Sequence, residues 1–101
     1  MIFPMQKMLS NGSNQTMKIK FTKAFKTQYK KAPKDIQTKF FKNLDLFFAD
    51  EFMPILNNHT LKGKWKECRS INITGNWRVI YTINENVYLF IAFGTHSQLY
   101  S

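Results

Sequence analysis

Residues 68–93 read CRSINITGNWRVIYTINENVYLFIAF, and this stretch decides the fold class. β-branched and aromatic residues dominate three runs within it: Cys68–Ile73, Trp77–Ile83 and Val87–Phe93. The connecting tripeptides, Thr-Gly-Asn and Asn-Glu-Asn, are typical of tight turns. Connections of this length favour antiparallel hairpins, so the stretch predicts a three-stranded meander.

Two amphipathic helices are predicted ahead of the meander. Thr22 offers an N-cap for the first helix, which should end before Pro33. Its aromatic residues recur every four positions and therefore share one side: Phe21, Phe25 and Tyr29. A second helix, from Lys34 to about Asp50, repeats this pattern with apolar residues facing inward: Ile36, Phe40, Leu44 and Phe47. Together the two helices form a helical hairpin.

The N-terminal part supplies one more strand and an extension. Residues 17–21 alternate apolar and polar side chains, which predicts a short strand pairing at one edge of the sheet. The order is then β-α-α-β-β-β, an α+β fold in which the helical hairpin covers one face of a twisted antiparallel sheet and the other face is free to bind. A chain of 101 residues favours one domain, placed at residues 17–101. Residues 1–16 are expected to be a loosely ordered extension, with Met17 as an alternative start; the other interpretation is an arm that packs on the domain.

The charge points to a polyanionic partner. Fifteen Lys and Arg residues against six Asp and Glu give a formal net charge of +9. No apolar run reaches the roughly 20 residues that span a bilayer, so nucleic acid is favoured over a membrane. One cysteine excludes an intrachain disulfide, and one cysteine with two histidines falls short of a usual zinc set. We therefore expect a cytoplasmic protein without a metal or cofactor.

Two histidines, His59 and His96, flank the meander. A histidine titrates near neutrality, so a pair can take a proton from an attacking hydroxyl and return one to a leaving oxygen. Cleavage of RNA by its own 2′-hydroxyl requires both transfers. The alternative is that the two side chains lie at the surface or stabilise turns.

Basic and aromatic residues around these histidines suit RNA. Arg69 and Arg78 fall on adjacent predicted strands, where two guanidinium groups on one face would hold a phosphate; the alternative is two solvated arginines. Tyr100 offers a ring that can stack on a base or close the core. A basic ridge that attracts backbone phosphates precedes the meander: Lys62, Lys64 and Lys66.

Three segments together resemble a known family. Residues 59–69 read HTLKGKWKECR, residues 77–81 read WRVIY, and residues 93–100 read FGTHSQLY. In this order they resemble the RelE/ParE toxin superfamily, and its YafQ-like mRNA interferases most closely. The resemblance covers residues 17–101 and implies a RelE-like fold.

The resemblance also implies an activity and a partner. It implies the toxin of a type II toxin–antitoxin system, a metal-independent endoribonuclease that cuts mRNA on the ribosome and leaves a 2′,3′-cyclic phosphate. An acidic, partly disordered antitoxin is the expected partner, because such a segment neutralises many lysines and folds on contact. Two other hypotheses are a ParE-like toxin that inhibits DNA gyrase and an inactive relative that only binds antitoxin.

The resemblance assigns roles to single residues. His59 and His96 match acid–base positions, and Tyr100 matches an aromatic position near the scissile phosphate. Arg69 and Arg78 match basic positions of the superfamily. The sequence departs from the family at Asn72 and Asn76, which stand where a histidine and an aspartate are frequent, and at Ala92 or Phe93, where an arginine is common. Both asparagines are expected to bind RNA, but a neutral amide cannot exchange a proton, so that work falls to the histidines or a lysine.

Overall fold

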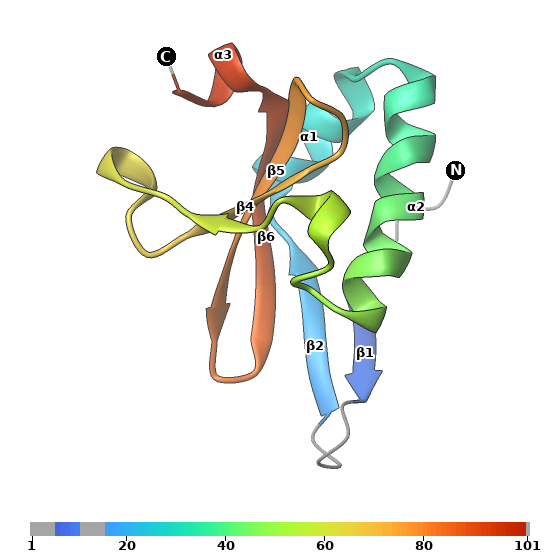
Figure 1. Cartoon of the computed structure of the whole chain (residues 1–101), viewed down its shortest axis with the longest axis vertical. Coiled ribbons are helices and arrows are strands. Elements are labelled where there is room, and N and C mark those ends of the chain that lie inside the picture. Colours follow the sequence, from blue (N-terminus) through green and yellow to red (C-terminus); the bar gives the residue numbers. More distant parts are fainter. Residues whose placement is uncertain (1–5, 11–15, 101) are drawn as a thin grey trace.

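The computed structural model describes residues 6–10 and 16–100. Within them the chain forms six strands in one sheet, with the order β1-β2-β6-β5-β4-β3, and three α-helices (Figure 1). The strands are β1 (Gln6–Ser10), β2 (Thr16–Phe21), β3 (His59–Thr60), β4 (Arg69–Asn72), β5 (Trp77–Asn84) and β6 (Val87–Thr95). The helices are α1 (Lys23–Lys31), α2 (Lys34–Ala49) and α3 (His96–Tyr100), with the short 3-10 helices η1 (Pro54–Leu56) and η2 (Gly63–Trp65).

The predicted helical hairpin and meander are both present, and the α+β class is confirmed. β4, β5 and β6 pair antiparallel, and α1 and α2 lie within one residue of the predicted bounds. One expectation about the sheet was wrong: β2 pairs with β6 in parallel, so the sheet is mixed. Alternation along a strand shows which face is buried, but it does not fix the direction of the neighbouring strand.

Residues 6–10 of the expected extension form a strand. These residues form β1, which pairs antiparallel with β2 from Gln6 opposite Lys20 to Ser10 opposite Thr16. The sheet thereby gains a strand beyond the predicted domain boundary at residue 17. The rest of the extension, residues 1–5 and 11–15, lies outside the described residues.

The core lies between the helical hairpin and one face of the sheet. Phe25 and Phe40 of the helices are 0% and 1% exposed, and their ring centroids lie 5.5 Å apart. The Phe93 ring of β6 lies 5.5 Å from both. Edge-to-face contacts of this kind add to the free energy gained from burial. The regular spacing of aromatic residues in the two helical segments therefore marks the side of each helix that is buried.

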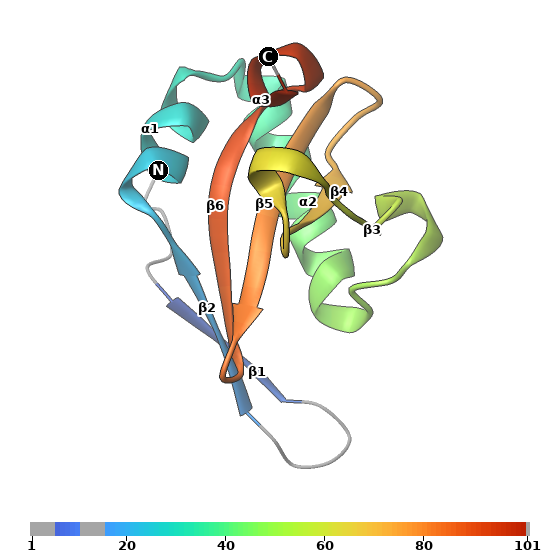
Figure 2. The same ribbon diagram turned by 90° about the vertical axis from the view of Figure 1, so that its left-hand side faces the viewer.

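The opposite side of the sheet, called here the outer face, carries a second and smaller apolar cluster. Its buried members are Ile80, Ala92 and Leu99, and half-buried residues pack around them: Leu61, Trp65, Cys68 and Tyr100. The sequence had predicted that this face would be free. In the structure, η2 and α3 cover part of it. Figure 2 shows η2 in front of β5 and α2 behind the sheet. The Trp65 indole nitrogen donates to the Leu99 carbonyl at 2.8 Å and ties these two elements together.

Candidate functional site

Strand register places one row of predicted site residues across the outer face. His59 pairs with Ser70, Ser70 pairs with Ile80, and Ile80 pairs with Ala92. Directly paired residues project from the same face of a sheet, and Ile80 and Ala92 belong to the outer cluster. His59 therefore projects from the outer face. The next row along the strands contains Asn72, Arg78 and Gly94.

His59 is half-buried at the edge of the sheet, and its ring orientation is fixed by a backbone contact. Its Nδ1 lies 2.8 Å from the Asn57 carbonyl oxygen. A carbonyl can only accept a hydrogen bond, so Nδ1 carries the proton and the neutral ring has its lone pair on Nε2. This tautomer has the form that a general base requires.

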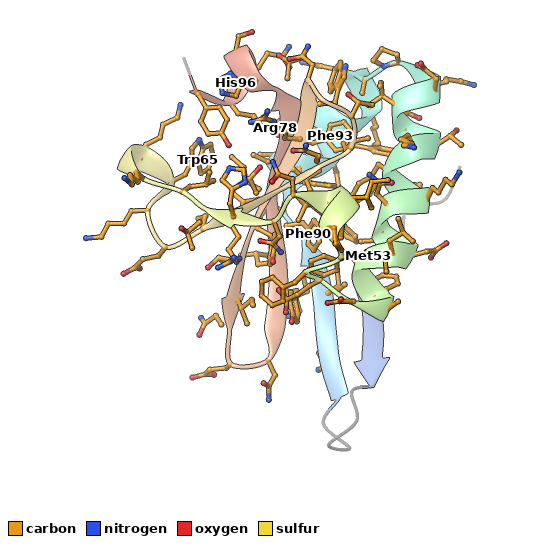
Figure 3. All side chains as sticks on the ribbon, in the orientation of Figure 1. Met53, Trp65, Arg78, Phe90, Phe93 and His96 are labelled. Carbon is orange, nitrogen blue, oxygen red and sulfur yellow. The ribbon has the colours of Figure 1, made fainter. Side chains whose placement is uncertain are left out.

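His96 borders the outer face at the start of α3. Its side chain is exposed, and its ring centroid lies 4.6 Å from that of Tyr100, which packs on the outer cluster. Its backbone N–H donates to the Asn76 carbonyl at 2.9 Å. Figure 3 shows His96 and Arg78 at the same end of the molecule, with Trp65 on the side of the sheet away from α2. Both histidines thus belong to one side of the sheet.

Four buried polar atoms on this side have no hydrogen-bond partner among the described residues: Ser70 Oγ, Asn72 Oδ1, Arg78 Nε and Tyr100 OH. Leaving a buried polar group unpaired costs about 1–3 kcal/mol. Each of the four atoms is closed to solvent, so they weaken the fold and are not open to a bound molecule in this structure. Arg78 makes one long contact, from its terminal nitrogen to the Gly75 carbonyl at 3.3 Å.

Arg69 does not join Arg78, so the expectation that the two arginines could share a face was wrong. Asn72 pairs with Arg78, whereas Arg69, three positions earlier on β4, pairs with Tyr81. Side chains three positions apart on a strand point to opposite faces. Arg69 Nε donates to Asn58 Oδ1 at 2.6 Å, and its guanidinium lies 5.1 Å from the Phe52 ring centroid.

A polar network around Arg69 was missed by the sequence analysis. The Glu51 carboxylate accepts hydrogen bonds from the Tyr81 and Tyr88 hydroxyls at 2.8 and 2.6 Å. Burial raises the pKa of both tyrosines, and the hydrogen bonds to Glu51 raise it further, so both hydroxyls remain donors. Glu51 and Asn58 follow α2 in a segment without periodicity, and no sequence signal marks them.

The remaining predicted RNA-binding residues surround the outer face. Lys62, Lys64 and Lys66 are exposed on and beside η2, and the Lys64 ammonium lies 5.6 Å from the Trp65 ring centroid. Asn76 is exposed in the turn before β5 and contacts His96 through its carbonyl. Its position keeps it near the histidine, although its side chain adds no acid or base.

Two other kinds of site find no support in the described residues. Cys68 is half-buried in the outer cluster, and burial, together with the nearby Glu67 carboxylate, raises the pKa of its thiol, which disfavours the nucleophilic thiolate. Within residues 6–10 and 16–100, His, Cys, Asp and Glu side chains nowhere gather in threes as a metal site would need. No helix in these ranges is long and apolar enough to cross a membrane.

Solved structures of bacterial toxins share this fold. YafQ from E. coli superposes with a TM-score of 0.69 at 23% identity, covering 84% of this chain and 99% of that one. The E. coli DinJ–YafQ complex gives 0.67 at 24% identity, with 84% and 99% covered. The YoeB–YefM complex from Staphylococcus aureus gives 0.64 at 20% identity, with 79% and 97% covered.

The sequence itself identifies the family. No curated protein matches the chain significantly. A family model described as "Bacterial toxin of type II toxin-antitoxin system, YafQ" matches residues 17–101, the stretch over which the resemblance was found. The chain therefore belongs to the YafQ family of bacterial toxins of type II toxin–antitoxin systems.

Proposed function

We propose that this toxin is an endoribonuclease that cuts mRNA in the cytoplasm, on the ribosome, by metal-independent acid–base catalysis on its outer face. The observation that carries the proposal is the position of His59, Arg78, His96 and Tyr100 on one side of the sheet. Two imidazoles can transfer the protons, a guanidinium can bind the phosphate, and an aromatic ring can stack on a base.

In this proposal the two histidines do different work. His59 Nε2 takes the proton of the 2′-hydroxyl, whose oxygen bonds to the adjacent phosphorus. The bond from phosphorus to the 5′-oxygen breaks, and His96 in its protonated form gives a proton to that oxygen. The products are a 2′,3′-cyclic phosphate and a free 5′-hydroxyl. Two transfers occur, one at each ring, so the pair ends with its protons exchanged.

Three other predicted site residues act on the substrate rather than on the proton. Arg78 binds the phosphate and offsets the charge that develops on its oxygens. Tyr100 stacks on an unpaired base next to His96, and Asn72 hydrogen-bonds beside Arg78. The exposed lysines of the basic ridge attract the RNA backbone whatever its sequence. Arg69 does not contact the substrate in this proposal, because its guanidinium is hydrogen-bonded to Asn58.

The proposed partner is an acidic antitoxin. The E. coli and S. aureus toxins of similar fold form complexes with DinJ and YefM, respectively. In this chain α1 and α2 expose several lysines: Lys23, Lys30, Lys31, Lys34 and Lys42. A flexible acidic segment lying along these helices would neutralise this charge. Without the antitoxin, the toxin keeps its net charge of +9 and is free to bind RNA.

The test is the substitution His96→Ala. Loss of a general acid lowers a rate by about 10²–10⁴-fold, so expression of the variant should no longer arrest growth. His96 is exposed, so circular dichroism and co-purification with the antitoxin should match those of the unaltered toxin. Ser97→Ala, at the next exposed position of α3, is the control and should stay toxic. Full toxicity of a folded His96→Ala protein would refute this assignment.

A supercoiling assay separates the proposal from gyrase inhibition. The RNase proposal expects cut mRNA and normal supercoiling in extracts that contain the toxin. Intact mRNA together with inhibited supercoiling would instead support a ParE-like activity, and an inactive relative would leave both unchanged.

A further inference from the structure

A hydrogen-bonded network lies directly behind the segment that presents His59. Asn58, the residue before His59, is its centre. The Asn58 amide nitrogen donates to the Glu51 carbonyl at 2.9 Å and to the Tyr81 hydroxyl at 2.7 Å. Its amide oxygen accepts from Arg69 Nε at 2.6 Å. The Asn58 amide therefore uses both its nitrogen and its oxygen in hydrogen bonds within the protein.

The orientation of the Asn58 amide is unambiguous. A guanidinium has donors and no acceptor, so the amide oxygen must face Arg69. Turning the amide over would set its nitrogen against the Arg69 donor and its oxygen against the Glu51 carbonyl. The Tyr81 hydroxyl in turn donates to the Glu51 carboxylate and accepts from Asn58, so donors and acceptors match around the network.

The segment that carries His59 has little other support. β3 contains two residues at the edge of the sheet, and short edge elements open easily. Asn57 adopts a left-handed conformation with φ 47°, and its carbonyl holds His59 Nδ1. The direction of the imidazole therefore depends on how residues 57 and 58 are held.

We propose that Asn58, held by Arg69 and Tyr81, is a positioning residue that fixes the tautomer and direction of His59 for catalysis on the outer face. The inference rests on the proposed function, in which His59 is the general base. It also gives Arg69 a role: its guanidinium acts on the base through Asn58 and makes no contact with the RNA phosphate. A misplacement of about 1 Å in a catalytic group costs up to about 10²-fold in rate, so the network matters even though it touches no substrate.

A double-mutant cycle tests the proposal in the full-length toxin. Asn58→Ala should lower kcat for RNA cleavage about 10- to 100-fold and leave KM nearly unchanged. In a His59→Ala background the same substitution should have no further effect on kcat, because no base remains to be positioned. Equal losses in both backgrounds would contradict the inference, since Asn58 would then act independently of His59.

A matched control separates positioning from general loss of stability. Tyr88→Phe removes the other hydrogen bond to the Glu51 carboxylate and leaves the Asn58 contacts in place. We expect it to destabilise the fold while kcat of the folded protein stays within about twofold of the unaltered value. A fall in kcat as large as that of Asn58→Ala would show that loosening anywhere in the network is sufficient, and the special role of Asn58 would be lost.

A spectroscopic measurement decides the inference even if the protein cuts no RNA. In ¹⁵N NMR spectra of the imidazoles, His59 should show the proton on Nδ1 in the unaltered toxin. In Asn58→Ala the signals should shift towards the Nε2-protonated form, while those of His96 stay the same. Unchanged His59 signals would overturn the positioning role. Absence of RNA cleavage by the unaltered protein would instead overturn the proposed function.

Discussion

At the scale of single residues, two buried polar side chains have opposite effects on the stability of this toxin. Asn43 and Ser70 are 3% and 0% exposed. The Asn43 amide donates to the carbonyls of Asn72 and Ile73 at 2.9 and 3.2 Å, and so joins α2 to the end of β4. The Ser70 hydroxyl has no partner among the described residues and faces the outer side. The first side chain stabilises the fold, whereas the second is buried without a partner and weakens it.

Ser70→Ala should therefore stabilise the protein. Removing an unpaired buried hydroxyl should raise the free energy of unfolding by about 1 kcal/mol, measured by urea denaturation. The same variant should cleave RNA at the unaltered rate, because the hydroxyl is closed to the substrate. The control is Asn43→Ala, which should lower the free energy of unfolding by about 1–3 kcal/mol because two carbonyls lose their donor. A loss of stability in Ser70→Ala would show that the hydroxyl is paired in solution.

Sequence reasoning proposed the candidate site residues but could not give their arrangement. His59, His96 and Tyr100 were proposed from residue type and from the resemblance, and the structure brings all three to one side of the sheet. Arg69 could not be placed, because its face depends on register. The irregular turn at residues 73–76 sets Asn72 opposite Arg78, and nothing in the composition of that turn fixes this pairing.

At the scale of elements, α1 is held at its first turn by one side chain. Thr22 Oγ1 accepts from the Phe25 backbone N–H at 3.1 Å and donates to the Ile91 carbonyl of β6 at 3.0 Å. The same hydroxyl therefore begins the helix and attaches it to the sheet. Correct capping matters for the whole core, because α1 carries the buried Phe25 and Tyr29.

Thr22→Ala should lower the free energy of unfolding by about 1–2 kcal/mol, since the cap and the bond to β6 are both lost. Thr22→Ser keeps the hydroxyl and should restore most of this loss. Thermal and urea unfolding of the two variants measure the difference. If both variants unfold like the unaltered toxin, the anchoring role of this hydroxyl is refuted.

Long elements were predictable and short ones were not. The periodicity of α2 extends over 16 residues and gave its bounds to within one residue. β3 has two residues and α3 has five. Segments this short cannot show the alternation of a strand or the 3.6-residue period of a helix. These short elements nevertheless carry His59 and His96. The candidate site is thus built on the parts of the chain where sequence patterns are weakest.

At the scale of the whole molecule, the two faces of the sheet carry different work. One face is closed by the helical hairpin and an aromatic core. The spacing of aromatic residues in the sequence was enough to predict this core. The other combines a small apolar cluster, unpaired polar atoms, two histidines and nearby lysines. The net charge of +9 led to the prediction of a polyanionic partner. The direction of β2 against β6 and the partial cover by η2 and α3 required the structure.

The account's central claim is that RNA is cut by its own 2′-hydroxyl on the outer face. The most direct test uses a short RNA with one mapped cut site and a second RNA with a single 2′-deoxy nucleotide on the 5′ side of that bond. On ribosomes programmed with these RNAs, the toxin should cut the first to a 2′,3′-cyclic phosphate, bind the second equally well and leave it intact. Cleavage of the deoxy-substituted strand at the same bond would contradict the claim.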